Sequence, residues 1–269
     1  MTQILPNYIL VEIFKYLPCS KIWSLQFFNS FLKKTMKEYN WIGIFRFRTT
    51  ITDDEFIKII NEWKLNKISL RFCENITDKS INRLEHVTSL DLRGCAKVTD
   101  ESIQKLKYVQ KIDLCYCQLI TDKSMKELIN LQRLDLFNCY TVTDESIKYL
   151  KKLTHLTLSY CHKITDESIK KLKHLTYLNL NTCGLISNKS MMELNMIQTL
   201  ILKNYVLISD EGIKHLTDIT CLELCNCYYI TDVSIKEFKK LKYLSSYGTG
   251  ISSKCIQTLR NNKVIIVNT

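Results

Sequence analysis

A cysteine recurs every 22 residues through most of the chain, and this period constrains the fold more than any other feature of the sequence. The cysteine ladder comprises Cys73, Cys95, Cys117, Cys139, Cys161, Cys183 and, two periods later, Cys227. Position 205, where another cysteine is due, holds Tyr205. Thr-Asp pairs recur at the same period, as at Thr143-Asp144 and Thr165-Asp166. A fixed short period of this kind is typical of a solenoid, in which each unit packs only on its neighbours.

Each unit is predicted to form a strand, a bend, a short helix and a return. Residues 134–155 read LDLFNCYTVTDESIKYLKKLTH, and Leu134 and Leu136 share one face of a strand because they are two positions apart. Apolar residues then recur every three positions from Ile147 to Leu153, as on one face of a short α- or 3₁₀-helix. The Thr-Asp pair before that face caps the helix and places negative charge at its positive end.

The chain has 12 cysteines, which in a short secreted protein would suggest disulfides. The first residues lack the basic and apolar regions of a signal peptide, so we expect reduced thiols. A small thiol fits in the bend after each strand, and its weak S–H donor can meet a backbone carbonyl. We therefore expect Cys139 and Cys161 to be buried. Cys115 and Cys225 lie on the opposite strand parity and should be more accessible.

The repeating pattern resembles the leucine-rich repeat, L-x-x-L-x-L-x-x-N/C-x-L. The continuation Cys161-His162-Lys163-Ile164-Thr165-Asp166 resembles the cysteine-containing subclass of that repeat. The resemblance covers residues 51–269, with a first unit from Ile51 to Trp63 and a closing strand at 264–267 as terminal caps. It implies an α/β solenoid over residues 47–269, with a parallel sheet on the concave side and short helices or 3₁₀ segments on the convex side.

Residues 1–46 do not share the period. Residues 5–18, LPNYILVEIFKYLP, place large apolar side chains at helical spacing between Pro6, which can open a helix, and Pro18, which can end one. This pattern resembles the helical F-box, L-P-x-E-I-L-x-x-I-F-x-x-L-P, and Trp41 suits its late tryptophan. The resemblance implies these adaptor-binding residues: Leu5, Pro6, Ile9, Leu10, Ile13, Phe14, Leu17, Pro18 and Trp41.

Together the two segments resemble F-box/leucine-rich-repeat proteins, the substrate receptors of SCF-type ubiquitin ligases. The resemblance implies that the F-box binds a Skp-family adaptor, and through it a cullin, while the repeats bind a target protein that the sequence does not identify. Three alternatives remain open at this point. The N-terminal segment could be a hydrophobic cap, the chain could be an interaction scaffold without a ligase role, or it could bind nucleic acid.

Lys and Arg outnumber Asp and Glu by 38 to 27, a net charge of +11, which raises nucleic acid as a partner. The lysines cluster at helix or return positions such as Lys151 and Lys171, and this is typical of a solvated convex surface. No aromatic base-stacking pattern accompanies them, which disfavours nucleic-acid binding.

No phosphate-binding glycine motif and no H-E-x-x-H zinc motif is present, so we expect no enzyme activity, no cofactor and no metal. Cys221, Cys225 and Cys227 are close in sequence, but Cys227 belongs to the inward ladder, which leaves too few thiols for a zinc site. No stretch approaches the roughly 18 apolar residues of a membrane span. We expect a cytoplasmic or nuclear protein.

The strand register predicts a target-binding surface. With Leu90 and Leu92 inward, alternation sends the residues between and beside them to the concave face, and later units repeat this at 22-residue steps. The aspartates of successive units then stack as a like-charge column, which is costly unless Arg93, Lys111 and Arg133 flank it. The alternative target site is the C-terminal turns around Tyr228 and Tyr229. The predicted concave residues are Asp91, Arg93, Asp113, Asp135, Phe137, His155, Tyr177 and Asn179.

Overall fold

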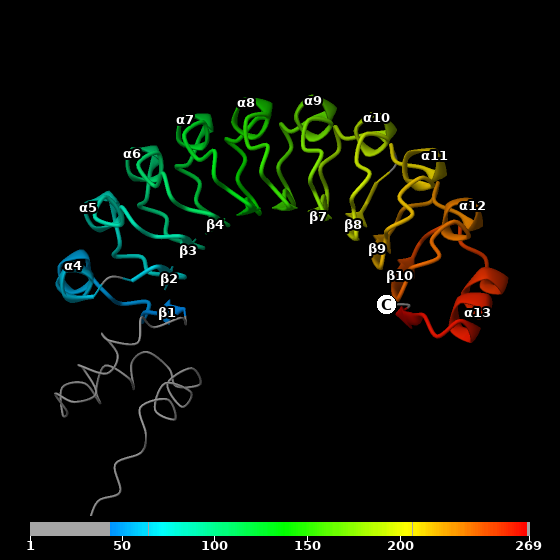
Figure 1. The fold of residues 1–269 in the computed structure, drawn as a ribbon, viewed down its shortest axis with the longest axis horizontal. Helices are drawn as coiled ribbons and strands as arrows, with labels where there is room; N and C mark the ends of the chain where they lie inside the picture. Colours follow the sequence, from blue (N-terminus) through cyan, green and yellow to red (C-terminus); the bar gives the residue numbers. More distant parts are fainter. Residues whose placement is uncertain (1–43, 64, 206, 268–269) are drawn as a thin grey trace, which may run out of the picture.

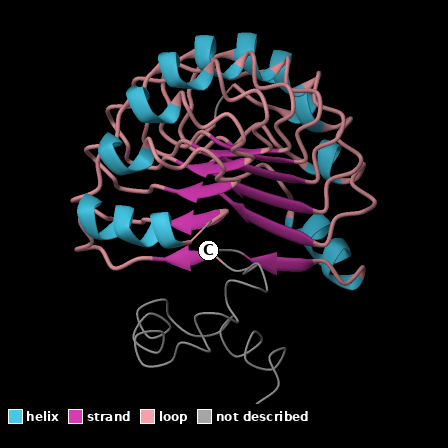
Figure 2. Ribbon diagram, turned by 60° about the vertical axis from the view of Figure 1, so that its left-hand side comes forward, coloured by secondary structure: helices cyan, strands magenta, loops and turns pink. Residues whose placement is uncertain are grey.

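Parallel strands and short helices alternate along the chain in the computed structural model, which describes residues 44–63, 65–205 and 207–267. The strands form one 11-stranded sheet in which each strand pairs with the next in sequence order. Figure 1 shows the units as an arch, with the strands on its inner side and the helices on its outer side. In Figure 2 the strands lie side by side beneath the helices. The predicted α/β solenoid with a concave parallel sheet is confirmed.

The strands are short and evenly spaced. They are β1 (Phe45–Arg46), β2 (Lys67–Ser69), β3 (Ser89–Asp91), β4 (Lys111–Asp113), β5 (Arg133–Asp135), β6 (His155–Thr157), β7 (Tyr177–Asn179), β8 (Thr199–Lys203), β9 (Cys221–Cys225), β10 (Tyr243–Tyr247) and β11 (Ile265–Val267).

One helix follows each strand except the last. The helices are α4 (Asp53–Glu62), α5 (Asp78–Ile81), α6 (Asp100–Ile103), α7 (Asp122–Met125), α8 (Asp144–Ile147), α9 (Asp166–Ile169), α10 (Asn188–Met191), α11 (Asp210–Ile213), α12 (Asp232–Ile235) and α13 (Ser253–Asn261). None of the helices among these described residues is both long and apolar enough to cross a bilayer.

The two ends of the sheet carry longer helices. Strand β1 starts at Phe45, two residues before the repeats expected from residue 47, and Phe45 is buried in register with Ile68 of β2. Helix α4 begins with a capping box, in which Thr52 accepts from the Glu55 amide and the Glu55 carboxylate accepts from the Thr52 amide. At the other end β11 pairs with β10, so the predicted closing strand is confirmed.

The core consists of two rows of apolar side chains that the stacked units bury together. Leu134 and Leu136 are at most 2% exposed, and Ile147, Leu150 and Leu153 are fully buried. Burial of each such side chain stabilises the fold by roughly 1.5–3 kcal/mol. The α8 helix itself ends at Ile147, and the three-residue period continues through tight turns, in which the Leu150 amide donates to the Ile147 carbonyl.

The Thr-Asp pairs do more than cap helices. Thr143 caps α8 as predicted, since its hydroxyl accepts from the Glu145 amide at 3.2 Å. Asp144 reaches the next unit, where its carboxylate accepts from the amide and the hydroxyl of Thr165 at 3.0 and 2.6 Å. Equivalent bonds join neighbouring units from Asp53 onward, and we call this series the aspartate ladder. It ties each helix to the next along the convex side.

The cysteine ladder is buried as predicted. Each ladder thiol is fully buried, and the Cys139 sulfur donates to the Leu114 carbonyl of the preceding unit at 3.2 Å. Burial raises the pKa of the Cys161 thiol to about 12, and the thiols are free of disulfides. Each cysteine thus joins two units, as well as filling the bend of its own.

The expectation that Cys115 is accessible is wrong. Its residue is 1% exposed, and its sulfur lies 2.8 Å from the Asp135 carboxylate. The cause is that strand β4 ends at Asp113, so simple alternation no longer applies and Cys115 packs between the carboxylates of Asp113 and Asp135. Cys225 is still part of the longer strand β9, as its last residue, and is half-buried.

This burial predicts the order of thiol labelling. In native protein Cys115, Cys139 and Cys161 should react slowly with an alkylating reagent, because the thiols are enclosed and their pKa values are raised. Cys225 should react faster. Mass spectrometry of digested protein, before and after denaturation, measures each rate. Labelling of Cys115 as fast as Cys225 would contradict the packing at the end of β4.

Candidate functional site

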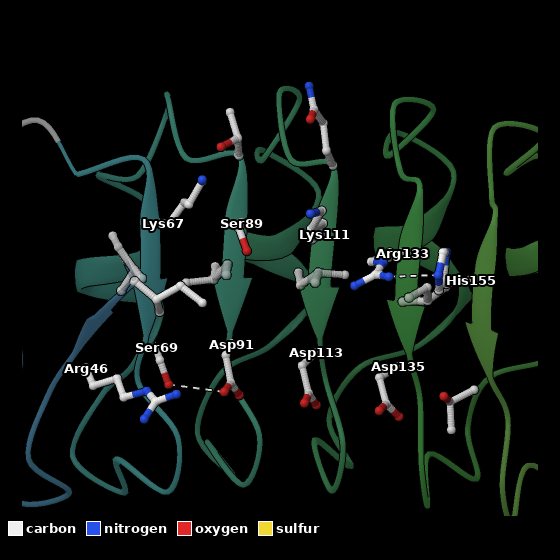
Figure 3. A pocket seen from close by; sticks show the side chains of 18 of the residues that line it. Arg46, Lys67, Ser69, Ser89, Asp91, Lys111, Asp113, Arg133, Asp135 and His155 are labelled. Atoms are coloured by element: carbon white, nitrogen blue, oxygen red, sulfur yellow. Dashed lines mark hydrogen bonds between the residues drawn. The ribbon is translucent and has the colours of Figure 1, made fainter. Parts of the chain in front are cut away.

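Two rows of side chains face the hollow of the arch and line a groove over β1 to β7. First residues of the strands form one row and third residues form the other (Figure 3). We call Lys67, Lys111 and Arg133 the basic row. We call Asp91, Asp113 and Asp135 the acidic row.

Arg93 neutralises part of the acidic row. Its guanidinium binds Asp113 at 2.9 and 3.2 Å and lies 3.5 Å from Asp135. These three side chains are only 21–29% exposed, so the pairing is screened less than at an open surface. Lys111 and Arg133, which the sequence also placed beside this column, form no salt bridge with it. They belong to the opposite row, at the other end of the strands.

The aspartates of the acidic row also hold the backbone. Asp113 accepts from the Cys115 amide at 3.0 Å, and Asp135 accepts from the Phe137 amide at 3.1 Å. Burial and the neighbouring charge of Asp113 raise the pKa of Asp135 above its usual value, against the opposing effects of Cys115, Phe137 and Arg93. These carboxylates are therefore largely committed to folding the strand ends. The ligand atoms of Asp113, Cys115 and Asp135 lie within 4.8 Å of one another, a grouping that could hold a metal ion. Arg93 already supplies the positive charge there.

His155 and Tyr177 come together as the register predicted. Their rings stack with centroids 5.7 Å apart and planes inclined by 14°. Arg133 lies 2.7 Å from His155 through Nη2 and Nε2. Asn179, on the third position of β7, accepts from the Ser159 hydroxyl at 3.0 Å. All three predicted residues are half-buried in the groove wall or beside it.

Phe137 belongs to a different cluster. Its ring lies between those of Tyr116 and Tyr160, with centroid distances of 5.2 and 5.3 Å. Phe137 is half-buried, whereas the two tyrosines are 42% and 41% exposed. We call these three residues the aromatic edge. It presents large apolar area beside charged groups, the composition that dominates protein-binding surfaces.

The tyrosines of this edge occupy an unusual backbone conformation. Tyr116 and Tyr160 have φ of +62° and +63°, the left-handed region that favours glycine and asparagine. The whole bend column shares it at 22-residue steps: Phe72, Gly94, Tyr116, Asn138, Tyr160, Thr182, Asn204, Asn226 and Gly248. Sequence reasoning missed this column, although its glycines and asparagines recur at the same period. A bulky residue there costs roughly 1–3 kcal/mol.

This strain predicts the effect of Tyr160→Asn. Asparagine relieves the left-handed strain, while loss of the ring removes a contact with Phe137 worth about 0.5–1.5 kcal/mol. We expect a free energy of unfolding within about 1 kcal/mol of the wild type, measured by urea unfolding. Tyr140→Asn, at an exposed bend position outside the left-handed column, is the matched control. A large loss from Tyr160→Asn alone would show that the ring stabilises the fold.

The C-terminal alternative is also an exposed aromatic surface. Tyr228 and Tyr229 are each 59% exposed in the bend before α12. Nearby, Cys221 and Cys225 are half-buried on β9, while Cys227 is buried and donates to the Leu202 carbonyl. The predicted adaptor-binding residues from Leu5 to Trp41 lie outside the described residues.

Comparisons with known proteins agree with this architecture. The family model described as "Leucine Rich repeat" matches residues 83–107, 149–173 and 171–194. No curated protein sequence matches the chain. The chain carries leucine-rich repeats, and the groove is the concave face of a leucine-rich-repeat solenoid.

Three solved structures illustrate the shared fold. An internalin of Listeria monocytogenes is 20% identical with a TM-score of 0.55, over 69% of this chain and 55% of that one. A leucine-rich-repeat protein of Leptospira interrogans is 24% identical with a TM-score of 0.52, over 78% and 62%. A TLR13–ssRNA13 complex is 18% identical with a TM-score of 0.58, over 82% and 34%. This chain therefore spans between a third and two thirds of their lengths.

Proposed function

We propose that this chain is the substrate-recognition subunit of an SCF-type E3 ubiquitin ligase. The solenoid is a protein-interaction scaffold, and the more specific role is supported by one observation in the sequence. Residues 5–18 keep both Leu-Pro pairs of the F-box pattern in register with its apolar positions. A hydrophobic cap for the solenoid needs apolar side chains but has no physical reason to keep both pairs at that distance.

In this role the N-terminal segment binds a Skp-family adaptor and, through it, a cullin. The repeats hold the target protein near the recruited conjugating enzyme. Catalysis then comes from proximity, because a tethered target presents its lysines at high effective concentration. The ladder cysteines are buried and their pKa values are raised, so they are poor nucleophiles. The ladder thiols are therefore unsuited to carry ubiquitin.

The concave face is the proposed target-binding surface. Of the residues predicted there, Phe137, His155 and Tyr177 offer the largest partly exposed rings. The aspartates and Arg93 shape the surface around them. Replacing Phe137 and Tyr177 together by alanine should abolish target capture while adaptor capture remains. The solenoid should still melt cooperatively, at a lower temperature because the ring contacts are lost. Retained target capture would move the site elsewhere, for example to the surface around Tyr228.

Adaptor capture tests the ligase role directly. Replacing Leu10, Ile13 and Phe14 by alanine removes three apolar contacts, each worth roughly 1.5–3 kcal/mol if buried at the interface. We expect co-purification of the Skp-family adaptor to be lost while the solenoid still melts cooperatively. The matched control removes three exposed apolar side chains of the solenoid instead, namely Ile129, Leu185 and Leu207.

The two outcomes separate the alternatives. Loss of the adaptor only in the N-terminal variant supports the receptor role. Failure of the unaltered chain to bind the adaptor, or undiminished capture by the N-terminal variant, would leave an interaction scaffold without a ligase role.

A further inference from the structure

Much of the positive charge of the chain gathers on one flank of the solenoid. Each unit returns from its helix to the next strand through a short segment, and four consecutive return segments cover residues 104–110, 126–132, 148–154 and 170–176. We call these segments the return flank. They hold nine lysines and one acidic residue, Glu127. The lysines are Lys105, Lys107, Lys126, Lys148, Lys151, Lys152, Lys170, Lys171 and Lys173.

The return segments lie side by side, so their charges form one continuous surface. The Thr154 amide donates to the Gln132 carbonyl at 2.9 Å, and the Gln132 amide donates to the Gln110 carbonyl at 2.8 Å. Side chains join the same segments, since the Lys152 ammonium donates to Oδ1 of Asn130 at 2.8 Å. In Figure 1 the arch is seen down its shortest axis, so its two flanks are its broad faces.

The opposite flank carries almost no charge. It is formed by the bends that follow the strands, and the four bends after β4 to β7 hold a single charged residue, Lys163. They cover residues 114–121, 136–143, 158–165 and 180–187. The two broad faces of the arch therefore differ in charge, and a basic partner surface is offered on one of them alone in these units.

Part of this charge is not neutralised within the protein. Four of the nine lysines form salt bridges with nearby glutamates. The other five are exposed, and none of them forms a salt bridge with any residue that the structure describes. These five are Lys107, Lys126, Lys151, Lys152 and Lys171. A surface of uncompensated lysines attracts an anionic partner.

Exposed apolar side chains stand among these lysines. Tyr108, Ile129 and Tyr149 belong to three successive return segments and are 61%, 57% and 46% exposed. They alternate with lysines instead of forming one apolar patch. Ile129, for example, has Lys107 and Lys151 at the equivalent positions of the two neighbouring units.

This mixture favours a lipid surface over a protein. The binding energy of a protein interface is concentrated in a central, well-packed cluster of anchor residues, which alternation with lysines prevents. A bilayer interface accepts each apolar group separately. Tyrosine is enriched at the boundary between membrane and water, and a lysine can lay its stem on apolar surface while its ammonium stays in water. Anionic headgroups attract every lysine that comes near them.

We propose that the return flank binds the surface of a bilayer that contains anionic phospholipids. Its lysines contact the headgroups, while Tyr108, Ile129 and Tyr149 enter the interfacial region. Binding of this kind occurs at the surface and needs no helix that crosses the membrane. The return flank is a different face from the concave groove. The proposal goes beyond the ligase role, because membrane binding requires neither the adaptor nor a target.

Co-sedimentation of the purified full chain with vesicles tests the proposal. One vesicle is phosphatidylcholine alone, and the other contains equal parts of phosphatidylcholine and phosphatidylserine. Binding should require phosphatidylserine and should weaken as the salt concentration rises. Lys107→Gln with Lys151→Gln and Lys171→Gln should lower the partition coefficient roughly 100-fold, because three lysines leave the charged surface. Arginine at the same three positions keeps the charge and should keep the binding.

The chain offers a matched control for the loss of charge. Lys97→Gln with Lys163→Gln and Lys189→Gln makes the same change of net charge at exposed positions outside the return flank and should leave binding close to that of the wild type. Thermal melting should show that both triple variants fold, because substitutions at exposed positions change stability little. Equal loss of binding in the two variants would reduce the contact to net charge and would overturn the proposal.

A second pair of variants tests the apolar contribution. Tyr108→Ser with Ile129→Ser and Tyr149→Ser keeps the charge and should also weaken vesicle binding, at least tenfold, since roughly 1.5–3 kcal/mol per fully buried side chain is at stake. Its control replaces three similarly exposed apolar side chains of the bends by serine and should bind like the wild type. Those control positions are Leu119, Leu185 and Leu207.

Three further results would overturn the proposal. The first is failure of the wild type to bind vesicles that contain phosphatidylserine. The second is tighter binding of polyglutamate at the same salt concentration, which would make the flank a contact for an acidic protein. The third is tighter binding of single-stranded RNA, which would make it a nucleic-acid contact.

Discussion

Replacing Asp210 by alanine should lower the free energy of unfolding by about 3 kcal/mol or more. The Asp210 carboxylate accepts from the amide and hydroxyl of Thr231 at 2.9 and 2.6 Å. It also accepts from the amide and hydroxyl of Ser234 at 3.2 and 2.5 Å. Ser234 is fully buried, so water cannot replace the lost acceptor. Buried donors left without a partner are the costly outcome of such a change.

The chain supplies matched controls for this variant. Glu211 is the next residue and is exposed, so Glu211→Ala should change the free energy of unfolding by less than about 0.5 kcal/mol. Asp210→Asn should be milder than Asp210→Ala, because an asparagine already serves at the equivalent position 188. There Asn188 accepts from the Ser209 amide and donates to the Ser209 hydroxyl, both at 2.9 Å. Urea unfolding of the three variants measures the differences.

The pH dependence of stability provides a second measurement on the aspartate ladder. Burial acts to raise the pKa of Asp210, but the bonds from Ser234 and Thr231 outweigh it, so the pKa is lowered from 3.8. The same balance lowers the pKa of Asp166. A carboxyl with a depressed native pKa stabilises the fold fully above its unfolded pKa, and this contribution is lost as pH falls through the native value.

We therefore expect the unfolding midpoint of the wild type to fall as the pH drops below about 4. Asp210→Asn cannot titrate at that position and should lose less stability over the same range. Identical acid dependence of the two proteins would contradict an ionised Asp210 in the ladder.

The sequence predicted the aspartate ladder only in part, for a physical reason. Within one unit the Thr143-Asp144 pair already satisfies a local pattern, an N-cap followed by an acidic first turn. The second partner of Asp144 is Thr165, 21 residues away, and it becomes a neighbour only when the units stack. Periodicity shows that a residue is repeated but does not show whether its partner lies in its own unit or in the next.

Alternation was reliable inside most strands, although Ile201 of β8 is buried together with both of its neighbours, and it failed just beyond the strand ends. Leu134 lies at the centre of β5 and is buried between two more exposed neighbours, and His155 and Tyr177 meet on the concave face. Cys115 follows the end of β4, where the backbone turns into a left-handed residue at Tyr116, and its parity no longer decides its exposure. The contacts of Arg133 depend on side-chain conformation, which the register leaves undetermined. Its choice of His155 over the acidic row therefore needed the structure.

The second large effect is expected at Tyr205, where a substitution that restores the repeat pattern should destabilise the fold. Tyr205→Cys restores the period of the cysteine ladder, yet we expect it to lower the free energy of unfolding by about 3–4 kcal/mol. Tyr205 is 1% exposed and is the largest fully buried side chain in the described part of the chain. Cysteine would leave most of that ring volume empty, and packed cores relax only in part around a cavity.

The tyrosine hydroxyl also bonds to the preceding unit, as the ladder thiols do, but at a different carbonyl. It donates to the Cys183 carbonyl of the preceding unit, and burial raises the pKa of Tyr205 so that the hydroxyl stays protonated. Tyr205→Phe keeps the ring and removes only this donor, so it should cost about 1–2 kcal/mol. Comparing the two variants by urea unfolding separates packing from hydrogen bonding. If Tyr205→Cys were as stable as the wild type, the unit would have to close around the smaller side chain, as the units with ladder cysteines do.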